Sequence, residues 1–290
     1  MSTAAKTQTV ARTLQVHSLG RAEVLIDGLA ADWHAQAAKE LFFFLLSHPE
    51  GSSKNEIFER LWGLESSPAS NNRFRVTVHR VRAALGRHDA IIEEYGRYRL
   101  SNEVLFSTDI HELYSVLERA NASNPGERRQ AYQHALSLYT GEYLAGENAD
   151  WVLEAREEHK AAYVRAALEL SLLHCDQGSC AAAVGALVRA LRADPFIGEN
   201  YHQKLMTCLS VVEGKYASIE HYRRFLAFLR EELEDSPMQE TRDLAERIKS
   251  GEGICKRKVG PEEGTGWTTN CPLTADGSCP GVFGELIKLA

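Results

Sequence analysis

The first fifty residues combine two short segments of strand-like alternation with one segment of helical periodicity. Residues 13–17 and 22–26 alternate apolar and polar positions as two short strands, with a glycine between them. Residues 33–47 repeat apolar positions at helical spacing, with Asp32 as the expected cap and Pro49 just beyond the end. This pattern predicts a small N-terminal sheet followed by a helix.

Two further helices and a hairpin follow. Ser53 and Glu56 have the spacing of a capping box, and the short helix that they open is expected to end at Gly63. After a polar loop, residues 71–85 form a third predicted helix, and residues 91–100 alternate as a hairpin. Strands, three helices and a hairpin, in that order, are typical of a winged helix-turn-helix with an N-terminal sheet.

The third predicted helix has one apolar and one basic face. Its apolar residues fall within one stripe of the helical wheel: Phe74, Val78, Val81 and Leu85. The opposite face and its flank carry basic and polar side chains with small apolar ones between them: Arg73, Arg75, Val76, Thr77, His79, Arg80, Arg82 and Ala83. Arginine pairs with guanine edges or phosphates, and small apolar side chains meet thymine methyl groups. The helix therefore suits a major groove.

The candidate DNA contacts lie on this helix and on the hairpin. We expect Val76, Thr77 and Arg80 to read bases. A second set is expected on bases or backbone: Arg73, Arg75, His79 and Arg97. Asn72, near the predicted helix start, is expected to donate to a phosphate, and Arg97 lies where a wing reaches phosphates or the minor groove. The alternative is a solvated, arginine-rich face and an ordinary hairpin-tip charge.

The second half of the chain has a different pattern. Residues 108–250 are rich in Ala, Leu, Glu and Arg with helical periodicity, and regular breaks divide them into six or seven helices in hairpins. Gly178 and Gly214 are 36 residues apart, close to the tetratricopeptide period. Such units stack into a solenoid with a concave face. That face is either a partner or dimerisation surface or, alternatively, plain packing between helices.

Composition and charge refine this division. The chain has 290 residues, which suggests two domains, and a net charge of −7, which taken whole argues against nucleic acid. The charge is uneven, however: residues 1–106 carry a net +1 and residues 107–290 a net −8. Five arginines and no acid lie between residues 71 and 88. Because surface helices normally mix both signs, this basic stripe favours a DNA contact.

Candidate chemistry is sparse. The sequence contains no phosphate-binding loop, no dinucleotide fingerprint, no zinc-protease motif and no arguable catalytic triad, so we expect neither an enzyme nor a metal or cofactor. The longest apolar run, residues 41–46, is too short to cross a bilayer, and the polar N-terminus lacks a signal-peptide core, which predicts a cytoplasmic protein. Cys175, Cys180 and Cys208 are interpreted as core residues. Three further cysteines fall in a tail that carries no recognisable site: Cys255, Cys271 and Cys279.

Three segments resemble a known family. Residues 54–63, 72–86 and 96–100 resemble the OmpR-type winged helix of SARP-like bacterial regulators, although Arg97 stands where that family often has a second glycine. Later segments resemble the bacterial transcriptional activator domain (BTAD) of the same regulators: 141–144, 150–157, 190–196 and 221–225. The resemblance covers roughly residues 12–250. It implies sequence-specific promoter binding, commonly as dimers on direct repeats, with recruitment of RNA polymerase.

The sequence therefore predicts an α+β N-terminal winged helix-turn-helix followed by an all-α, tetratricopeptide-like helical repeat domain. The expected domains are residues 1–106, 107–250 and an irregular tail, 251–290. The expected function is a transcriptional activator that binds double-stranded promoter DNA as a homodimer and contacts RNA polymerase subunits, with no membrane partner. The alternative is a helical-repeat adaptor whose winged helix binds protein, although such an adaptor has no need of an acid-free arginine helix.

Overall fold

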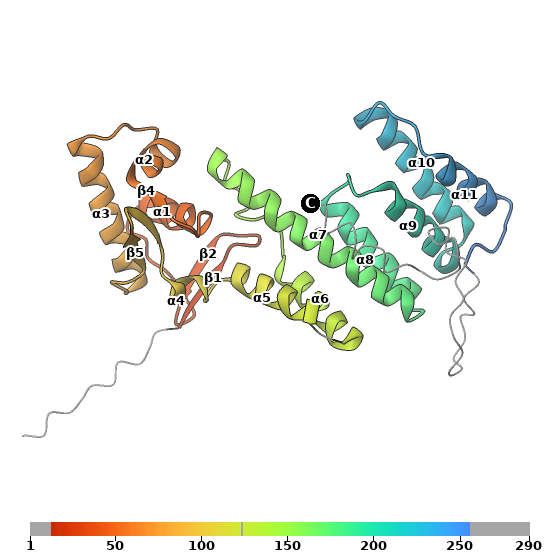
Figure 1. The fold of residues 1–290 in the computed structure, drawn as a ribbon, viewed down its shortest axis with the longest axis horizontal. Coiled ribbons are helices and arrows are strands. Elements are labelled where there is room, and N and C mark those ends of the chain that lie inside the picture. The colour runs from red at the N-terminus through yellow and green to blue at the C-terminus, as the bar shows by residue number, and fades with distance from the viewer. Residues whose placement is uncertain (1–12, 123, 256–290) are drawn as a thin grey trace, which may run out of the picture. The chain divides into compact units, whose positions relative to one another are not determined.

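The computed structural model describes residues 13–122 and 124–255 (Figure 1). Their contacts divide the chain into two compact units. Unit 1 takes its described residues from 13–118 and 137–161, and unit 2 from 119–136 and 162–255. Unit 1 holds the strands and the first helices, whereas unit 2 is helical, so the predicted fold class is confirmed. The domain boundaries after residues 106 and 250 stay predictions.

Unit 1 begins with an antiparallel sheet in the order β1-β2-β3. The two predicted strands are confirmed as β1 (Leu14–His17) and β2 (Glu23–Ile26). A third strand, β3 (Leu29–Ala30), was not predicted; it pairs with β2 across Asp27-Gly28, whose φ angles of 53° and 79° reverse the chain tightly. Only a two-residue pairing results, which is too short to leave an alternation in the sequence.

Helix α1 (Gln36–Leu46) lies in the core of unit 1, and all six residues of the apolar run 41–46 are buried. The helix begins three residues later than predicted, and the expected cap is wrong. The carboxylate of Asp32 accepts a hydrogen bond from the backbone N–H of His34 at 3.0 Å, whereas the N-cap is Ala35, without a side-chain bond. Asp32 thus closes a turn ahead of the helix rather than the helix itself.

Helix α2 (Lys54–Trp62) has the predicted capping box and ends at Gly63, whose φ of 61° suits glycine. The Ser53 N–H donates to the Glu56 carboxylate at 2.6 Å, and this bond holds the pKa of Glu56 below its usual value.

Helix α3 (Pro68–Leu85) starts earlier than predicted. Ser67 and Ser70 form a second capping box, and Pro68 occupies the first helical position, where its missing N–H costs nothing. The polar loop expected up to residue 72 is therefore partly helix. As a consequence Asn72 lies in the second turn of α3, away from the helix start where we expected it to meet a phosphate.

The predicted hairpin is confirmed as β5 (Ile91–Glu94) and β6 (Arg97–Leu100), which we call the wing. A short strand before α2, β4 (Ser52–Ser53), completes a sheet in the order β4-β6-β5. The pairing of β4 with β6 joins residues about 45 positions apart, and it anchors the wing beside α2. Helix α4 (Asn102–Leu105) follows.

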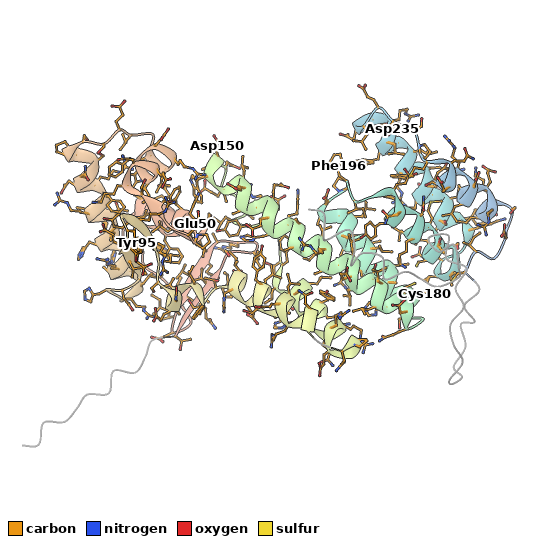
Figure 2. The ribbon with its side chains drawn as sticks, in the orientation of Figure 1. Glu50, Tyr95, Asp150, Cys180, Phe196 and Asp235 are labelled. Atoms are coloured by element: carbon orange, nitrogen blue, oxygen red, sulfur yellow. The ribbon has the colours of Figure 1, made fainter. Side chains whose placement is uncertain are left out.

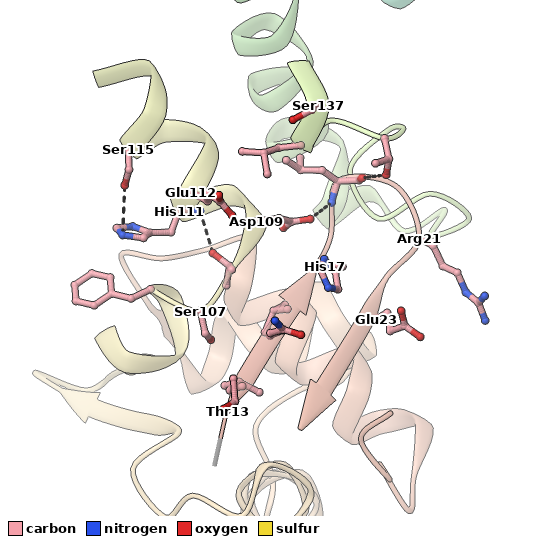
Figure 3. Close-up of a pocket in the computed structure, with 18 residues that line it drawn as sticks. Thr13, His17, Arg21, Glu23, Ser107, Asp109, His111, Glu112, Ser115 and Ser137 are labelled. Carbon is pink, nitrogen blue, oxygen red and sulfur yellow. Dashed lines mark hydrogen bonds between the residues drawn. The ribbon is translucent and has the colours of Figure 1, made fainter. Parts of the chain in front are cut away.

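The carboxylate of Asp109, at the start of α5 (Asp109–Ala122), holds the turn between β1 and β2. It accepts hydrogen bonds from the N–H of Ser18 at 2.7 Å, from the hydroxyl of Ser18 at 2.6 Å and from the N–H of Leu19 at 2.8 Å. Figure 3 shows Asp109 reaching this backbone. The same turn pairs with the chain after α6 (Pro125–Leu138), because the N–H of Leu144 donates to the Ser18 carbonyl at 2.8 Å.

A polar cluster lies inside unit 1 beside this turn. The hydroxyls of Tyr143 and Ser47 are 2.9 Å apart, and the Tyr143 ring meets the His159 ring edge-on at 4.7 Å. The Tyr114 hydroxyl lies 3.0 Å from Nδ1 of His159. Burial lowers the pKa of His159 to about 4 and raises the pKa of Tyr143 well above its usual value. Both side chains are therefore neutral at neutral pH.

The described helices of the second half of the chain follow the predicted breaks. After α6 and the short 3₁₀ turn Asp150–Val152 they are α7 (Leu153–Asp176), α8 (Cys180–Ala193), α9 (Glu199–Val212), α10 (Lys215–Glu232) and α11 (Gln239–Lys249). Tyr222, Phe225 and Leu229 are buried, as their spacing predicted. Cys180 and Cys208 are also buried, and Cys175 is half-buried. Cys271 and Cys279 lie outside the described residues.

Two buried histidines stack inside unit 2. Nδ1 of His202 lies 3.3 Å from Nε2 of His221, and the rings are nearly parallel. The Phe225 ring also stacks on His202, with the centroids 4.0 Å apart. Burial lowers the pKa of His202 to about 3 and that of His221 to about 4, so neither ring carries charge in the folded protein near neutral pH.

We predict that Asp109→Ala lowers the free energy of unfolding by about 1–3 kcal/mol, because two backbone N–H groups lose a charged acceptor in a partly buried place. Urea unfolding followed by circular dichroism measures the change. Glu118→Ala, at an exposed position of the same helix, is the control and should change little. Equal stability of the two variants would contradict the role given to Asp109.

We also predict that stability falls as the pH drops from 7 to 5. His159, His202 and His221 have folded-state pKa values far below the ordinary 6.5. The unfolded chain therefore takes up protons first, and stability that is complete above about pH 6.5 is lost on the way down, by at most about 1.4 kcal/mol per pH unit for each histidine. In thermal unfolding at both pH values, His221→Gln should show a weaker pH dependence than the parent; an unchanged dependence argues against this origin.

Candidate nucleic-acid interface

The orientation of α3 is set by its apolar stripe. Phe74, Val78, Val81 and Leu85 are all buried, as predicted, and α3 packs against α1 and β5. Phe74 contacts aromatic rings of α2 and of the wing, with the Tyr98 ring edge-on at 4.7 Å. This packing turns the opposite side of α3 toward solvent (Figure 1).

The solvent side of α3 carries basic groups without partners. Arg75, His79 and Arg80 are exposed, and none makes a hydrogen bond or ion pair within the described part of the chain. Val76 lies among them with 39% of its surface exposed, as expected for a side chain that the core does not need. Since no acid occurs between residues 71 and 88, the positive charge of this face is not neutralised by its own helix.

Two other candidates on α3 are also exposed. The guanidinium of Arg73 lies over the Trp62 ring, 4.5 Å from its centroid, so this cation bridges α3 to α2 while its edge stays accessible. Asn72 is exposed in the second turn. Both residues therefore border the basic face, and the contact with Trp62 fixes the position of Arg73.

Thr77 does not belong to this face. Only 2% of its surface is exposed, and its hydroxyl donates to the Arg73 carbonyl at 2.8 Å. As the side chain is placed, base reading by Thr77 is excluded. The sequence contained the signal: Phe74, Thr77, Val78 and Val81 stand at i, i+3, i+4 and i+7, which is the full width of a buried helical band. The predicted apolar stripe therefore left out Thr77, which is buried with it.

The wing arginines hold the wing together. Arg97 donates from Nε at 3.1 Å and from Nη2 at 2.5 Å to the Gly51 carbonyl, and it lies 3.5 Å from the Glu56 carboxylate. Arg99 donates to Glu94 at 2.8 Å. In this arrangement Arg97 fixes β6 beside β4, while 44% of its side chain stays exposed. A contact of Arg97 with DNA stays a prediction.

Sequence reasoning missed one structural arginine. Arg82 was grouped with the basic flank of the third helix, yet its Nη2 donates to the Ile91 carbonyl at 2.7 Å and ties α3 to the wing. Its half-buried position distinguishes it from Arg75 and Arg80. No local spacing signals this bond, because its acceptor is a backbone carbonyl in another element.

Other chemistry is limited in the described residues. They contain no group of three or more His, Cys, Asp or Glu side chains placed to hold a metal ion. An open cavity of about 860 Å³ lies between the first sheet and the start of α5 (Figure 3). Its wall residue Asp109 already accepts three hydrogen bonds, and most of the other lining side chains are uncharged. No described helix is both long and apolar enough to span a membrane.

Comparison with known proteins agrees with this arrangement. Residues 108–249 match the family model of the bacterial transcriptional activator domain. Among solved structures, the chain is similar to EmbR of Mycobacterium tuberculosis, determined in complex with a low-affinity phosphopeptide, with a TM-score of 0.67 at 18% identity. The match covers 83% of this chain and 66% of that one, just under two thirds of the relative's length. No curated protein matches the chain.

Residues 108–249 thus carry a bacterial transcriptional activator domain, and the fold of the chain is that of a regulator such as EmbR, as the resemblance implied. The likeness to EmbR is a likeness of fold, because the sequence identity is low. The matched family is one of regulator domains and not of enzymes.

We predict that Arg97→Gln lowers the free energy of unfolding by about 1–2 kcal/mol, because the Gly51 carbonyl loses its charged donor. Arg75→Gln is the matched control. It removes the same charge from an arginine that has no partner among the described residues, so it should stay within about 0.5 kcal/mol of the parent. Chemical denaturation of both variants is the measurement. If Arg97→Gln is as stable as Arg75→Gln, Arg97 is not a structural tie.

Proposed function

We propose that this regulator binds double-stranded promoter DNA by inserting α3 into the major groove, with the wing beside it on the flanking backbone. The observation that carries the proposal is the exposed, acid-free face of α3, on which Arg75 and Arg80 have no partner within the described residues. An arginine without an internal partner keeps all its donors for guanine edges or phosphates.

The candidate residues fall into two groups according to their place on the exposed face of α3. Arg80 and Val76 occupy the middle of the exposed face and are proposed to read bases, Val76 by contact with a thymine methyl. Arg75, His79, Arg73 and Asn72 are proposed to bind bases at the margin or phosphates, which fixes the register of the helix on the duplex. Thr77 is left out because it is buried.

We further propose that the helical unit supplies the protein contacts. A solenoid of helical hairpins offers an extended surface for a second copy of the chain and for RNA polymerase subunits, which would make the protein an activator. The family name supports a role in activation. The EmbR structure is of a complex with a low-affinity phosphopeptide. That ligand is a property of EmbR and is not proposed for this chain.

The alternative is an adaptor whose winged helix binds protein. The positive charge of α3 favours DNA binding over the adaptor, because a protein-binding face does not need unpaired arginines without acidic residues nearby. Capture of a partner by the full chain, together with no retention of duplex DNA, would favour the adaptor.

We predict steeply salt-dependent binding to a duplex selected by the protein from random-sequence DNA, with a slope that reflects the number of phosphates neutralised. Arg75→Gln should weaken binding to all sequences alike and reduce the slope by about one. Arg80→Ala should cost about 1–3 kcal/mol and relax the preference at one position of the selected site. Titration by fluorescence anisotropy at several salt concentrations measures these effects.

Arg224→Gln serves as the control, because it removes the same charge from an exposed position on α10. It should leave both the affinity and the selected sequence unchanged. Two outcomes contradict the proposal: no duplex binding at about 50 mM salt, where phosphate contacts are strong, or equal effects of Arg80→Ala and Arg224→Gln.

A further inference from the structure

The tip of the wing is built from an unusual residue. Tyr95, labelled in Figure 2, and Gly96 are the two central residues of the turn between β5 and β6. Their φ angles are 52° and 77°. Both angles are left-handed, which is the backbone of a tight hairpin turn and strongly favours Asn-Gly or Asp-Gly. A bulky aromatic residue is a conformational outlier there. The side chain of Tyr95 is fully exposed, so no burial compensates the strain.

The same chain contains an ordinary version of this turn. Asp27 and Gly28, between β2 and β3, have φ angles of 53° and 79°, nearly identical to those of Tyr95 and Gly96. There the Asp27 carboxylate accepts a hydrogen bond from the N–H of Thr13 at 2.9 Å, so its side chain ties the turn to the start of β1. Tyr95 makes no hydrogen bond or ring contact with the described residues. The aromatic side chain of Tyr95 is therefore not required to form the hairpin turn.

The charged groups near the tip are engaged within the wing or with its support. Arg97 is bound to the Gly51 carbonyl, and Arg99 is paired with Glu94. The Glu93 carboxylate accepts a hydrogen bond from the Tyr98 hydroxyl at 2.6 Å. What the tip presents outward is thus a phenol ring with its hydroxyl, next to carboxylates whose charge is partly offset by these bonds.

We propose that Tyr95 is the wing's DNA contact: its ring lies against a deoxyribose at the edge of the minor groove, and its hydroxyl donates to a backbone phosphate. Tyrosine is among the side chains that donate to phosphate oxygens, and it needs no counter-charge to do so. The bond from Arg82 to the Ile91 carbonyl holds the wing against α3 and so sets the position of Tyr95 relative to the groove-reading helix. This assignment rests on the proposed function.

Tyr95→Asn tests the assignment because it should make the protein more stable and yet weaken its binding to DNA. Asparagine is favoured at this turn position, so the melting temperature should rise, by about 2–4 °C. The affinity for the duplex selected by the parent chain from random-sequence DNA should nevertheless fall, by roughly three- to tenfold. Tyr95→Phe keeps the ring and should lose only the hydroxyl's share, with an unchanged salt slope because no charge is removed.

Asp27→Asn is the matched control, since it alters the equivalent turn of the first sheet and should leave the affinity unchanged. A photo-crosslinking residue, p-benzoylphenylalanine, placed at position 95 should label the duplex outside the bases read by α3, whereas the same residue at position 27 should not label DNA.

The outcomes separate this assignment from the proposed function. If Tyr95→Asn binds DNA like the parent while Arg80→Ala binds weakly, α3 reads DNA and Tyr95 does not contact it. If Tyr95→Asn leaves DNA binding intact but weakens self-association in sedimentation, the tip meets a second copy of the chain, and the DNA assignment is wrong. If the parent chain binds no duplex, the proposed function and the assignment fall together.

Discussion

The carboxylate of Asp109 is the interaction on which the arrangement of unit 1 depends. Its three hydrogen bonds hold the turn between β1 and β2 against the start of α5. The same turn pairs with the segment that carries Tyr143, and the Tyr143 hydroxyl reaches Ser47 just after α1. Since α1 packs directly on α3, these contacts connect a single charged group to the placement of the basic helix. A partly buried carboxylate is stable in such a place when its oxygens accept hydrogen bonds, as both oxygens of Asp109 do here.

The fold also sorts the arginines of the winged helix into two kinds. Arg82, Arg97 and Arg99 donate to carbonyl or carboxylate oxygens of neighbouring elements and stabilise the wing. Arg75 and Arg80 have no such acceptor within the described residues. Arginine's planar set of donors serves both purposes equally well, so composition alone does not distinguish them. What distinguishes them is whether an unsatisfied acceptor lies within reach of the folded backbone.

Local signals in the sequence carried most of the secondary structure. The Ser53–Glu56 capping box, the apolar stripe of α3 and the wing hairpin depend on neighbours within a few residues, and all are present in the structure. What the sequence did not signal has two kinds of cause. The bond of Arg97 to the Gly51 carbonyl has no local signal, because its acceptor is 46 positions away. The α3 start was misplaced for a local reason, since the Ser67–Ser70 box was overlooked. For the DNA contacts themselves, the sequence indicates the face but not which side chains the fold leaves unpaired.

The internal ties of the wing affect how binding energy is used. A loop that orders only when it meets DNA loses conformational entropy in doing so, and that loss subtracts from affinity. Here the bonds of Arg82 and Arg97 hold the wing on α2 and α3 before any ligand arrives. Arg82 and Arg97 thus contribute by positioning the wing. Arg75, Arg80 and the exposed ring of Tyr95 are left for the proposed DNA contacts. The arginines of a basic stripe therefore serve two functions: some hold the fold together and others are available to bind DNA. Which function an arginine serves depends on whether a hydrogen-bond acceptor of the protein lies beside its guanidinium.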